Sequence, residues 1–587
     1  MAKITLNTPI TNLQSHNYYT DGIDPTATSW FLQDDDTGTV FGEVTGSSFT
    51  YGSYSNDLTA GTIESISYIA DDGNRAWTIS GLSISASSYD LYLNNAIATG
   101  NAFTDYLVNQ VLSGDDTIIG SSGNDSIVYS KGKDYIDAGS GVDTINFGKL
   151  SSVVNVNLTS EKYTVDSIGS TIKNVENVIG GSAADTIIGN SSANVIHGGY
   201  GSDTINGGAG NDTIYGDGGN NTLNGGDGND IIVVHNTRYH DNAVNGGNGT
   251  DTVKFISSTT GLDINLDMGQ AVELNDKYPD YIFTLAEVEN VIGTSFNDKI
   301  VGDSGNNVIN GGAGNDSIDG GAGLDMADYS TSYKAVNVNL VSGVVTGYGT
   351  DQLSNIEGVI GSNFNDIIKG NSANNTIKSG NGADIIFADA GNDFIDGGSG
   401  VDTLNLSTVS SGMSIDLSLT TSQNTGGSGT DKIISIENLV GSKFVDKLLG
   451  NASANYIEAG AGNDSINGAN GNDSIVGGLG ADRMTGGNGI DKFIFKSSSD
   501  SLTTSQDTIT DFVSGIDKIV LNEIDANTTI AGNQDFSLIS SSANFSGAGQ
   551  IKFSNGVLSG DTNGDGAADF GIIFSGVTTL TATDFIL

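Results

Sequence analysis

Aspartate side chains recur every nine residues through much of this 587-residue sequence. In Gly198–Val233, which reads GGYGSDTIN, GGAGNDTIY, GDGGNNTLN and GGDGNDIIV, one column holds Asp203, Asp212 and Asp230. Carboxylate oxygens and the exposed carbonyls of glycine turns form a flexible, all-oxygen ligand set that suits Ca²⁺ and suits Zn²⁺ poorly. The aspartate column is therefore a candidate calcium site that repeats along the chain.

Each nonapeptide has two halves that position this column. The glycines of the first half adopt positive φ without a Cβ penalty and build a tight turn. The second half places one apolar residue between polar ones, which predicts a short strand with one face inward. Two nonapeptides then make a coil of about eighteen residues, and equivalent turns stack at roughly ~4.8 Å. The pattern predicts an all-β parallel β-roll whose apolar column contains Ile205, Ile214, Leu223 and Ile232.

Stacked aspartates repel one another. At an effective dielectric of about 20, two carboxylates ~5 Å apart repel by roughly 3 kcal/mol. Burial of one Ile or Leu per repeat returns only ~2 kcal/mol. The stack therefore needs a hard divalent cation, and we expect the chain to be disordered without calcium.

These nonapeptides resemble the RTX, or hemolysin-type, calcium-binding repeat, whose family forms calcium-dependent parallel β-rolls. The resemblance implies several bound Ca²⁺ ions as cofactors. The repeats fall into five blocks, at residues 112–146, 180–254, 293–328, 361–405 and 441–494. The candidate calcium ligands in these blocks are Asp116, Asp125, Asp134, Asp143, Asp185, Gly199, Gly201, Asp203, Gly208, Gly210, Asp212, Gly226, Gly228, Asp230, Asp251, Asp298, Gly312, Gly314, Asp316, Gly321, Gly323, Asp325, Asp366, Asp384, Asp393, Asp402, Asp446, Asp464, Asp473, Gly478, Gly480, Asp482 and Asp491.

The opening repeats of blocks two to five depart from this pattern. Their first repeats lack the second glycine pair, as in GTSFND and GSNFND, and we expect weak or absent calcium there. Alternatively, these positions only turn the chain. Their second repeats replace Asp with a residue that keeps an oxygen and loses the charge: Asn194, Asn307, Asn375 and Asn455.

Spacers of related sequence separate the blocks. Each contains an alternating segment such as VVNVNL and ends in a segment such as VENVIG, which predicts two strands that continue the coil with longer, calcium-free loops. The spacers cover residues 147–179, 255–292, 329–360 and 406–440. One glutamate recurs in them, and we interpret it as a repeated structural hydrogen bond instead of a catalytic set: Glu176, Glu289, Glu357 and Glu437.

Residues 1–111 contain no nonapeptides and hold both tryptophans, which indicates a separate small β-rich module of unknown role. Alternation in Ala76–Ser80 and Leu82–Ala86 predicts half-buried strands. Apolar residues at helical spacing in Phe103–Leu112 predict a short helix over the open end of the first coil.

Residues 495–587 resemble the C-terminal region of serralysin-type secreted proteases, on the strength of SQDTITDFVSGIDKIVL (505–521) and GDTNGDGAADFGIIF (560–574). In that family this region caps the roll and carries an uncleaved signal for a type I secretion channel. The final Asp584–Leu587, an acid followed by three apolar residues, matches that pattern. The resemblance implies a β-rich cap and export through such a channel.

A second calcium motif lies inside this region. Asp561, Asn563, Asp565 and Asp569 have the D-x-N-x-D-G spacing of a calcium loop, although the twelfth position is Ile572 instead of Glu. The alternative is a polar β-hairpin turn.

Composition limits the possible partners and compartments. The net charge of −48 repels nucleic acid and anionic lipid, so neither is an expected partner. There is no cysteine, which removes disulfides and thiol catalysis. No apolar run approaches the ~18 residues of a membrane span, and the N-terminus has no secretory signal pattern. We expect a protein that is secreted by a Gram-negative-type bacterium and stays extracellular or at its cell surface.

Catalytic motifs are missing from the sequence. It contains no H-E-x-x-H, nucleophile elbow, P-loop or dinucleotide fingerprint. The four histidines, His16, His197, His235 and His240, are scattered. His235 and His240 share a loop with Arg238 that could bind an anion or a metal, but we favour the interpretation that they are solvated loop residues.

Two classes of function remain. The first is a non-enzymatic, calcium-binding structural protein that self-associates at the cell surface as a surface layer, matrix or coat. The second is a secreted adhesin, sugar-binding protein or enzyme whose active part is residues 1–111, with the roll as carrier and cell-surface polysaccharide as a candidate partner. We favour the first, because ~110 residues without a catalytic constellation are a poor enzyme, whereas the roll fills most of the chain.

Overall fold

The computed structural model divides into two compact units, Met1–Gly293 and Thr294–Leu587. In residues 29–33, 40–51, 58–69 and 75–85 the structure describes the backbone strands alone. No helix in the described residues is long and apolar enough to cross a membrane. The structure describes residues 29–33, 40–51, 58–69, 75–85, 115, 117–120, 122–129, 131–235, 241–274, 282–427 and 429–587.

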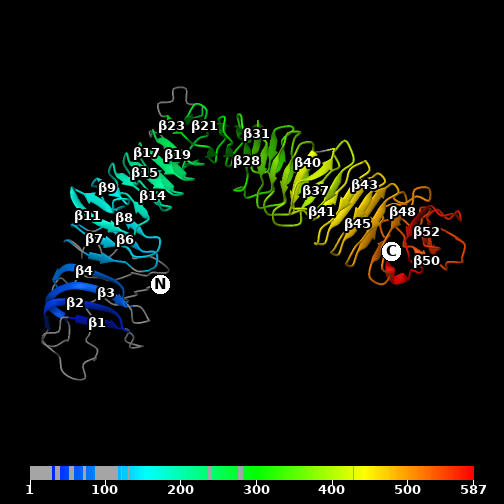
Figure 1. Ribbon diagram of the computed structural model, residues 1–587, viewed down its shortest axis with the longest axis horizontal. Helices are drawn as coiled ribbons and strands as arrows, with labels where there is room; N and C mark the ends of the chain where they lie inside the picture. The colour runs from blue at the N-terminus through cyan, green and yellow to red at the C-terminus, as the bar shows by residue number, and fades with distance from the viewer. Residues whose placement is uncertain are drawn as a thin grey trace, which may run out of the picture. The chain divides into compact units, whose positions relative to one another are not determined.

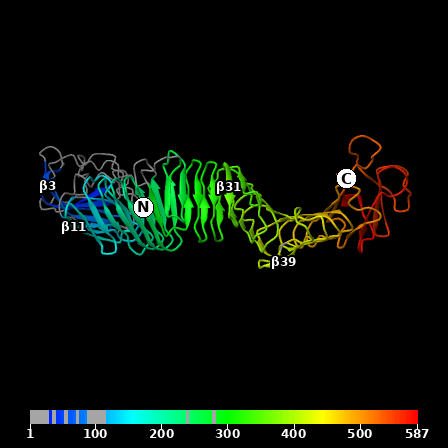
Figure 2. The same cartoon turned by 90° about the horizontal axis from the view of Figure 1, so that it is seen from above.

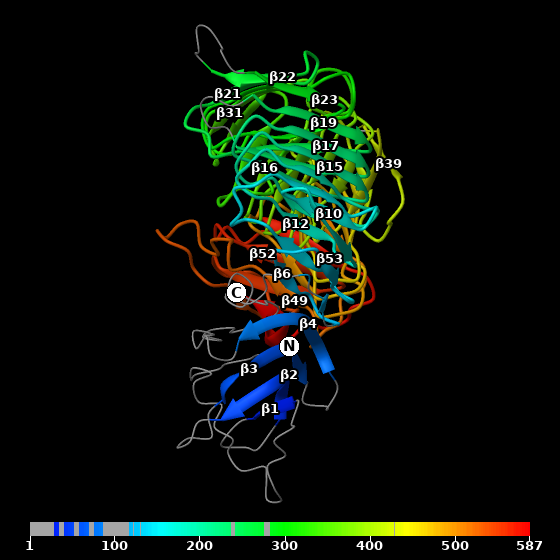
Figure 3. The same ribbon diagram turned by 90° about the vertical axis from the view of Figure 1, so that its left-hand side faces the viewer.

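In the first unit, successive nonapeptides send their strands alternately to two parallel sheets (Figure 1). β15 (Thr204–Ala209) pairs in parallel with β17 (Thr222–Asp227), and β16 (Thr213–Asp217) pairs in parallel with β18 (Ile231–His235). Residues eighteen apart are thus neighbours across the sheet, as in the pair Ile205 and Leu223. Figure 3 shows β15, β17 and β19 (Ala243–Asn248) stacked in chain order. The predicted parallel β-roll is confirmed.

The remaining strands of the first unit are β1 (Ser29–Gln33), β2 (Val40–Tyr51), β3 (Leu58–Ile69), β4 (Arg75–Ser85), β5 (Thr117–Ile119), β6 (Ser126–Val128), β7 (Tyr135–Asp137), β8 (Thr144–Asn146), β9 (Val154–Asn157), β10 (Lys162–Val165), β11 (Ile168–Lys173), β12 (Asn177–Ile179), β13 (Thr186–Ile188), β14 (Val195–His197), β20 (Thr252–Ile256), β21 (Leu262–Asn265), β22 (Gln270–Glu273), β23 (Phe283–Ala286) and β24 (Asn290–Ile292).

The roll of the second unit contains β25 (Lys299–Val301), β26 (Val308–Asn310), β27 (Ser317–Asp319), β28 (Met326–Asp328), β29 (Asn337–Asn339), β30 (Val344–Thr346), β31 (Thr350–Ser354), β32 (Gly358–Ile360), β33 (Ile367–Lys369), β34 (Thr376–Lys378), β35 (Ile385–Phe387), β36 (Phe394–Asp396), β37 (Thr403–Asn405), β38 (Ser414–Asp416), β39 (Gln423–Gly426), β40 (Gly429–Ile434), β41 (Asn438–Val440), β42 (Lys447–Leu449), β43 (Tyr456–Ala461), β44 (Ser465–Asn467), β45 (Ser474–Leu479), β46 (Arg483–Thr485) and β47 (Lys492–Ile494).

The predicted apolar column forms the core between the two sheets. Ile205 and Leu223 are 1% exposed, and Ile214 and Ile232 are fully buried. In these four strands, inward aliphatic side chains therefore line the interior. Seen from above, the strands of successive coils in the first unit lie side by side and run in one direction (Figure 2).

The spacers contain more strands than the sequence indicated. In the first spacer, β9 and β12 are the two predicted strands, and they pair in parallel with repeat strands. Between them β10 runs antiparallel to both β9 and β11, so a hairpin is inserted into one sheet. β22, β30 and β39 repeat this antiparallel strand in the other spacers. The prediction of two strands missed the hairpin because a short polar strand lacks a hydrophobic period of its own.

At the N-terminal side, β1 to β4 form an antiparallel meander, and β4 is one continuous strand over residues 75–85, where the sequence predicted strands over residues 76–80 and 82–86. β4 also pairs antiparallel with β5 of the first coil. The helix predicted over Phe103–Leu112 lies outside the described residues. The predicted domain boundaries stay predictions.

The C-terminal region extends the roll and adds antiparallel strands to one of its sheets, because β53 pairs in parallel with β48. β48 (Asp507–Ile509) and β49 (Lys518–Val520) pair in parallel with strands of the last block. β51 (Gln550–Ser554), β52 (Val557–Asp561) and β53 (Phe570–Phe574) form an antiparallel sheet. The short η2 (Ala582–Asp584) leads into β54 (Phe585–Ile586), which pairs with β49; β50 spans Ser537–Leu538.

Adjacent residues of β18 allow a direct test of this inside-outside pattern. Ile232 is fully buried, whereas its neighbour Ile231 is 41% exposed. We expect Ile232→Ala to lower the free energy of unfolding by about 2–5 kcal/mol, because it leaves a cavity in the core. Ile231→Ala should change it by only about 0.5 kcal/mol. Urea unfolding of both variants in calcium, followed by circular dichroism, measures the difference, and equal losses would contradict the register.

Candidate calcium centre

A backbone hydrogen bond between coils places the column aspartates of block two. The nonapeptide positions are numbered one to six as G-G-x-G-x-D, so that the aspartate occupies position six. The Asp212 N–H donates to Asp230 Oδ1 at 2.7 Å, and the Asn194 N–H donates to Asp212 Oδ1 at 2.7 Å. The Asp185 N–H donates to Asp203 Oδ1 at 2.8 Å. These bonds link one coil to the next, so the predicted stacking of the aspartates is confirmed.

This bond uses one carboxylate oxygen and leaves the other, Oδ2, inside the turn. Oδ2 of Asp212 is buried and has no hydrogen-bond donor among the described residues. A buried anionic oxygen without a partner is costly, and a cation would remove that cost. The column aspartates with such an unpartnered Oδ2 are Asp143, Asp203, Asp212, Asp230, Asp251, Asp316, Asp325, Asp384, Asp402, Asp464, Asp473, Asp482 and Asp491.

A space without side chains lies beside Oδ2 of Asp212 and beside Oδ2 of Asp230. A Cβ on Gly207, at position one, would lie 2.3 Å from Asp212 Oδ2 and 2.6 Å from the Gly225 carbonyl oxygen of the next coil. A Cβ on Gly225 would lie 2.2 Å from Asp230 Oδ2. Carboxylate and carbonyl oxygens thus converge on one small space, and both are ligands that Ca²⁺ prefers. The residues present fit a calcium ion.

The ligands would come from paired turns and not from a carboxylate cluster. No group of three or more His, Asp or Glu side chains in the described part of the chain could hold a metal ion. Main-chain carbonyls therefore have to complete the coordination. The glycines predicted as ligands lie at positions two and four of the turns, and all of them have positive φ.

Burial raises the pKa of several column aspartates. The pKa of Asp143 rises to about 6, that of Asp212 to about 7 and that of Asp316 to about 8. Desolvation is the main cause, and the negative charges of neighbouring carboxylates add to it. The column without a cation is therefore strained at neutral pH, as the repulsion argument predicts.

The first repeats of the blocks are different. Oδ2 of Asp366 accepts the Ser362 N–H at 2.5 Å, and Oδ2 of Asp446 accepts the Ser442 N–H at 2.6 Å. Asp185 and Asp298 accept equivalent bonds at 2.6 Å. Weak or absent calcium in these repeats stays a prediction, and this hydrogen bonding gives it a physical basis.

Block one is only partly described. Asp116 lies outside the described residues. The Asp125 N–H donates to Asp143 Oδ1 at 2.7 Å, so this pair follows the general pattern. Oδ2 of Asp134 instead accepts the Tyr163 hydroxyl, at 3.2 Å, from the following spacer. The spacer thus supplies a donor where other turns leave an oxygen free.

The recurring spacer glutamates have the structural role that the sequence predicted. The N–H of the last aspartate in the preceding block donates to the glutamate side chain, for example Asp143 to Glu176 Oε2 at 2.8 Å and Asp402 to Glu437 Oε2 at 2.9 Å. Glu289 and Glu357 accept equivalent bonds, at 2.7 and 3.1 Å. The glutamate replaces the carboxylate of the next coil.

Four aspartates of the columns were missed in the sequence. In the spacers, Asp351 and Asp431 accept the N–H groups of Asp316 and Asp393, both at 2.9 Å. In the C-terminal region, Asp507 and Asp517 accept those of Asp482 and Asp491, at 2.8 and 3.1 Å. Oδ2 of Asp507 is also buried without a donor among the described residues. The pattern Asp-x-Ile in Asp507–Ile509 and Asp517–Ile519, without glycines, was the available signal.

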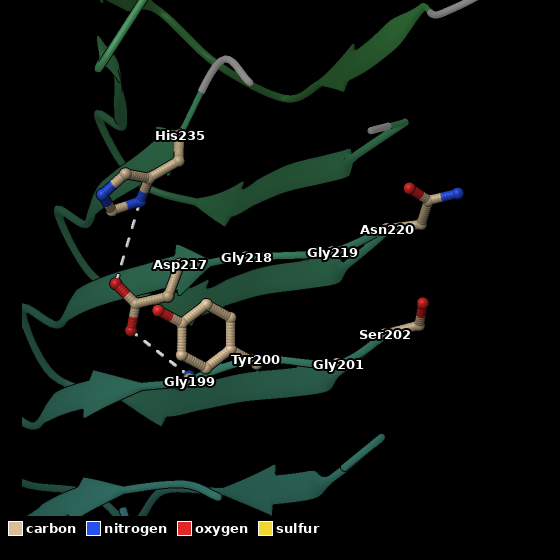
Figure 4. Close-up of a pocket in the computed structure, with 9 residues that line it drawn as sticks. All are labelled: Gly199, Tyr200, Gly201, Ser202, Asp217, Gly218, Gly219, Asn220 and His235. Atoms are coloured by element: carbon tan, nitrogen blue, oxygen red, sulfur yellow. Dashed lines mark hydrogen bonds and ion pairs between the residues drawn. The ribbon is translucent and has the colours of Figure 1, made fainter. Parts of the chain in front are cut away.

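One turn of block two carries its carboxylate on the outside. Position six is Asn221, and Asp217 occupies position two with φ 52°. Asp217 Oδ2 lies 3.2 Å from His197 Nδ1, and Oδ1 lies 3.8 Å from His235 Nδ1. Figure 4 shows Asp217 and His235 beside Tyr200, in a cavity of about 770 Å³. His235 thus contacts a carboxylate, while Arg238 and His240 lie outside the described residues.

The second calcium motif forms a hairpin turn between β52 and β53. Asp561 accepts the N–H groups of Gly564 and Gly566, at 2.6 and 3.0 Å. Asp569 accepts the Thr562 N–H at 2.7 Å and the Asn563 amide at 2.7 Å. Its carboxylates are satisfied within the hairpin, unlike those of the columns. Calcium binding by Asp561, Asn563, Asp565 and Asp569 stays a prediction.

The raised pKa values give a pH test. A carboxyl whose folded pKa exceeds its unfolded value, near 3.9, favours the folded state when protonated, and that stability is lost as pH rises through the folded pKa. With folded pKa values of about 6, 7 and 8 for Asp143, Asp212 and Asp316, the loss begins near the unfolded pKa and ends near pH 8, so part of it falls between pH 5.5 and 7.5. In a chelator, circular dichroism should therefore show more β-structure at pH 5.5 than at pH 7.5. Equal or smaller β-content at pH 5.5 would contradict the buried columns.

Comparisons with known proteins agree with this architecture. The family described as "RTX calcium-binding nonapeptide repeat (4 copies)" matches residues 112–145, 179–214, 197–232, 292–327, 360–395 and 369–404. The family described as "Peptidase M10 serralysin C terminal" matches residues 394–587, a longer segment than the sequence motifs indicated. No curated protein matches the sequence.

A solved structure with similarity is the solution structure of the AlgE6R3 subunit from the Azotobacter vinelandii mannuronan C5-epimerase. It shares 24% sequence identity, covers 24% of this chain and 79% of its own, and has a TM-score of 0.19. The two family matches show that the chain contains RTX calcium-binding nonapeptide repeats and a serralysin-type C-terminal region, and they support a calcium-binding, type I secreted protein.

Proposed function

We propose that this protein is an extracellular structural protein whose β-roll folds as calcium binds and which then self-associates at the bacterial cell surface. The observation that carries the proposal is the series of buried, unpartnered Oδ2 atoms, which recurs in both units. Each of these atoms needs a cation in the folded state. Calcium binding and folding are therefore one equilibrium.

The ions would be held by the aspartates with an unpartnered Oδ2, together with glycine carbonyls of the adjacent turns. Cytosolic free calcium is too low for sites of extracellular affinity, so the chain folds after export. A chain that stays unfolded until it leaves the cell is compatible with passage through a type I channel. The chain has no cysteine, so no disulfide can stabilise the fold outside the cell.

The negative charge that makes folding depend on calcium also favours self-association that depends on calcium. A net charge of −48 keeps copies of the chain, and an anionic cell surface, apart at low divalent ion concentration. Bound and bridging Ca²⁺ would lower that repulsion. A surface layer, matrix or coat that assembles only outside the cell follows from this coupling.

Single substitutions test the proposed ligands. Asp212→Asn removes a carboxylate whose Oδ2 is unpartnered, whereas Asp366→Asn removes one whose Oδ2 already accepts the Ser362 N–H. We expect Asp212→Asn to raise the calcium midpoint of folding by about tenfold, a loss typical of a damaged metal site. Asp366→Asn should move it by less than about twofold. Circular dichroism during a calcium titration measures both, and equal shifts would contradict the assignment.

Sedimentation tests the structural role. Full-length protein is expected to form large assemblies at millimolar calcium and to remain monomeric in a chelator. Magnesium at the same ionic strength serves as the control, because it screens charge but fits the flexible oxygen sites poorly. Analytical ultracentrifugation under the three conditions separates these outcomes. A folded, strictly monomeric protein in calcium that binds or hydrolyses a glycan would instead favour the carrier role with an active part in residues 1–111.

A further inference from the structure

Three departures from the nonapeptide pattern meet at one edge of block two. Tyr200 occupies position three of its turn, Asp217 occupies position two of a later turn, and His235 follows Asp217 by eighteen residues. Tyr200 pairs with Gly218 in a parallel bridge, and Asp217 pairs with Val234 at the end of β18. The three side chains therefore come from successive coils and line the cavity of about 770 Å³ (Figure 4). Side chains that break a repeat at one place are candidates for function.

The turn that contains Asp217 carries its charge on the outside. At position six, where the preceding and following turns hold Asp212 and Asp230, this turn holds Asn221. The Asn221 amide donates to the Gly216 carbonyl oxygen at 2.7 Å, so a neutral group faces the interior. Asp217 has φ 52°, a left-handed conformation that aspartate tolerates better than most residues. The turn has thus lost its inward carboxylate and gained an outward one.

Asp217 keeps one oxygen available to a ligand. Its Oδ2 accepts the Gly199 N–H at 3.3 Å and lies 3.2 Å from His197 Nδ1. Its Oδ1 accepts no hydrogen bond from the described residues and lies 3.8 Å from His235 Nδ1, beyond hydrogen-bond distance. The Asp217 side chain is 25% exposed. One oxygen is therefore held in place, and the other can accept a hydrogen bond from a ligand.

The Tyr200 ring provides a flat apolar surface in the same cavity. The residue is 74% exposed. Position three of the next coil is Gly218, and a Cβ there would lie 3.1 Å from Tyr200 Cδ1. Gly218 therefore lies against the ring without a side chain that could cover it. Both the ring and the Asp217 carboxylate remain open to a ligand in the cavity (Figure 4).

Neutral polar groups complete the lining. Ser202 and Asn220 occupy position five of the turns that hold Tyr200 and Asp217, and both are exposed. Figure 4 shows them on the side away from Asp217. Asn220 Oδ1 accepts the Asp241 N–H at 3.1 Å, which leaves the Asn220 amide group to donate. The cavity therefore presents an anionic acceptor, uncharged donors and an aromatic face.

This combination fits an uncharged ring that is rich in hydroxyl groups. Sugar hydroxyls donate to a carboxylate and accept from an amide, and the C–H face of a pyranose packs on an aromatic ring. An organic amine can only donate, so it leaves the Asn220 amide without an acceptor. An acidic sugar is repelled by Asp217 and by the net charge of −48. The volume of about 770 Å³ is typical of small-ligand cavities.

We propose that this cavity binds a neutral sugar unit, which stacks on Tyr200 and donates a hydroxyl hydrogen bond to Asp217 Oδ1. The site goes beyond the proposed function, because it depends on the folded block two and neither on self-association nor on residues 1–111. It gives the roll a contact of its own with uncharged polysaccharide.

Glycan binding by the full-length protein, folded in calcium, tests the class of ligand. The probe is an array that carries neutral hexose and N-acetylhexosamine oligosaccharides beside uronic-acid oligosaccharides. We expect binding to neutral glycans and none to uronic-acid glycans, because a sugar carboxylate would face Asp217. Stronger binding of the uronic-acid glycans, or binding of no neutral glycan, would overturn the proposal. Spermidine binding in place of the neutral glycans would instead assign the cavity to an organic amine and also overturn it.

Two substitutions test whether the glycan occupies the cavity. Tyr200→Ala removes the stacking face, and Asp217→Asn removes the charge of the acceptor with a residue that tolerates φ of 52°. We expect each to weaken the affinity for the best-binding oligosaccharide by about tenfold, the effect of one hydrogen bond to a charged group or of one stacked ring. Isothermal titration calorimetry in calcium measures the change. Unchanged affinity in either variant would overturn the proposal.

Two matched controls remove similar groups outside the cavity. Leu479→Ala removes a 52% exposed apolar side chain from position three of a turn in block five. Asp227→Asn removes one carboxylate from an exposed position three in block two. Both should change the affinity by less than about twofold, because exposed charges away from the ligand are screened by salt. Losses equal to those of Tyr200→Ala and Asp217→Asn would overturn the proposal, while calcium-dependent folding, followed by circular dichroism of the same samples, leaves the proposed function standing.

Discussion

One hydrogen bond determines much of this protein: the backbone N–H at position six donates to the carboxylate Oδ1 of the next coil. The bond fixes the side chain in the turn and directs its second oxygen inward. Repeated from coil to coil, as from Asp212 to Asp230, it produces a column of buried negative charge. The fold and the demand for a cation therefore have the same origin.

The period of nine residues was sufficient to predict the parallel β-roll, the buried column from Ile205 to Ile232 and the stacking of the aspartates. It also indicated that the spacer glutamates are structural, as the bond from Asp143 to Glu176 shows. These features repeat, so many weak local signals support one register. A strict period is strong information even when many strands have only three residues.

Features that break the period were not predictable in the same way. The hairpin strand β10 carries no repeat signature, and Asp351 and Asp431 join the columns only because spacer strands return to the sheet. The direction of the Ser362 N–H depends on the backbone φ of one residue. That angle cannot be derived from the sequence GSNFND. Such features follow from the local geometry of the backbone and become visible only in three dimensions.

The central claim is that the inward Oδ2 atoms are calcium ligands. A crystal structure of the full-length protein grown in calcium, with anomalous diffraction data, tests it most directly. The account predicts anomalous peaks at ligand distance, about 2.3–2.6 Å, from Oδ2 of Asp212 and Asp230, and none beside Asp366. A folded roll without peaks at Asp212 and Asp230 would contradict it.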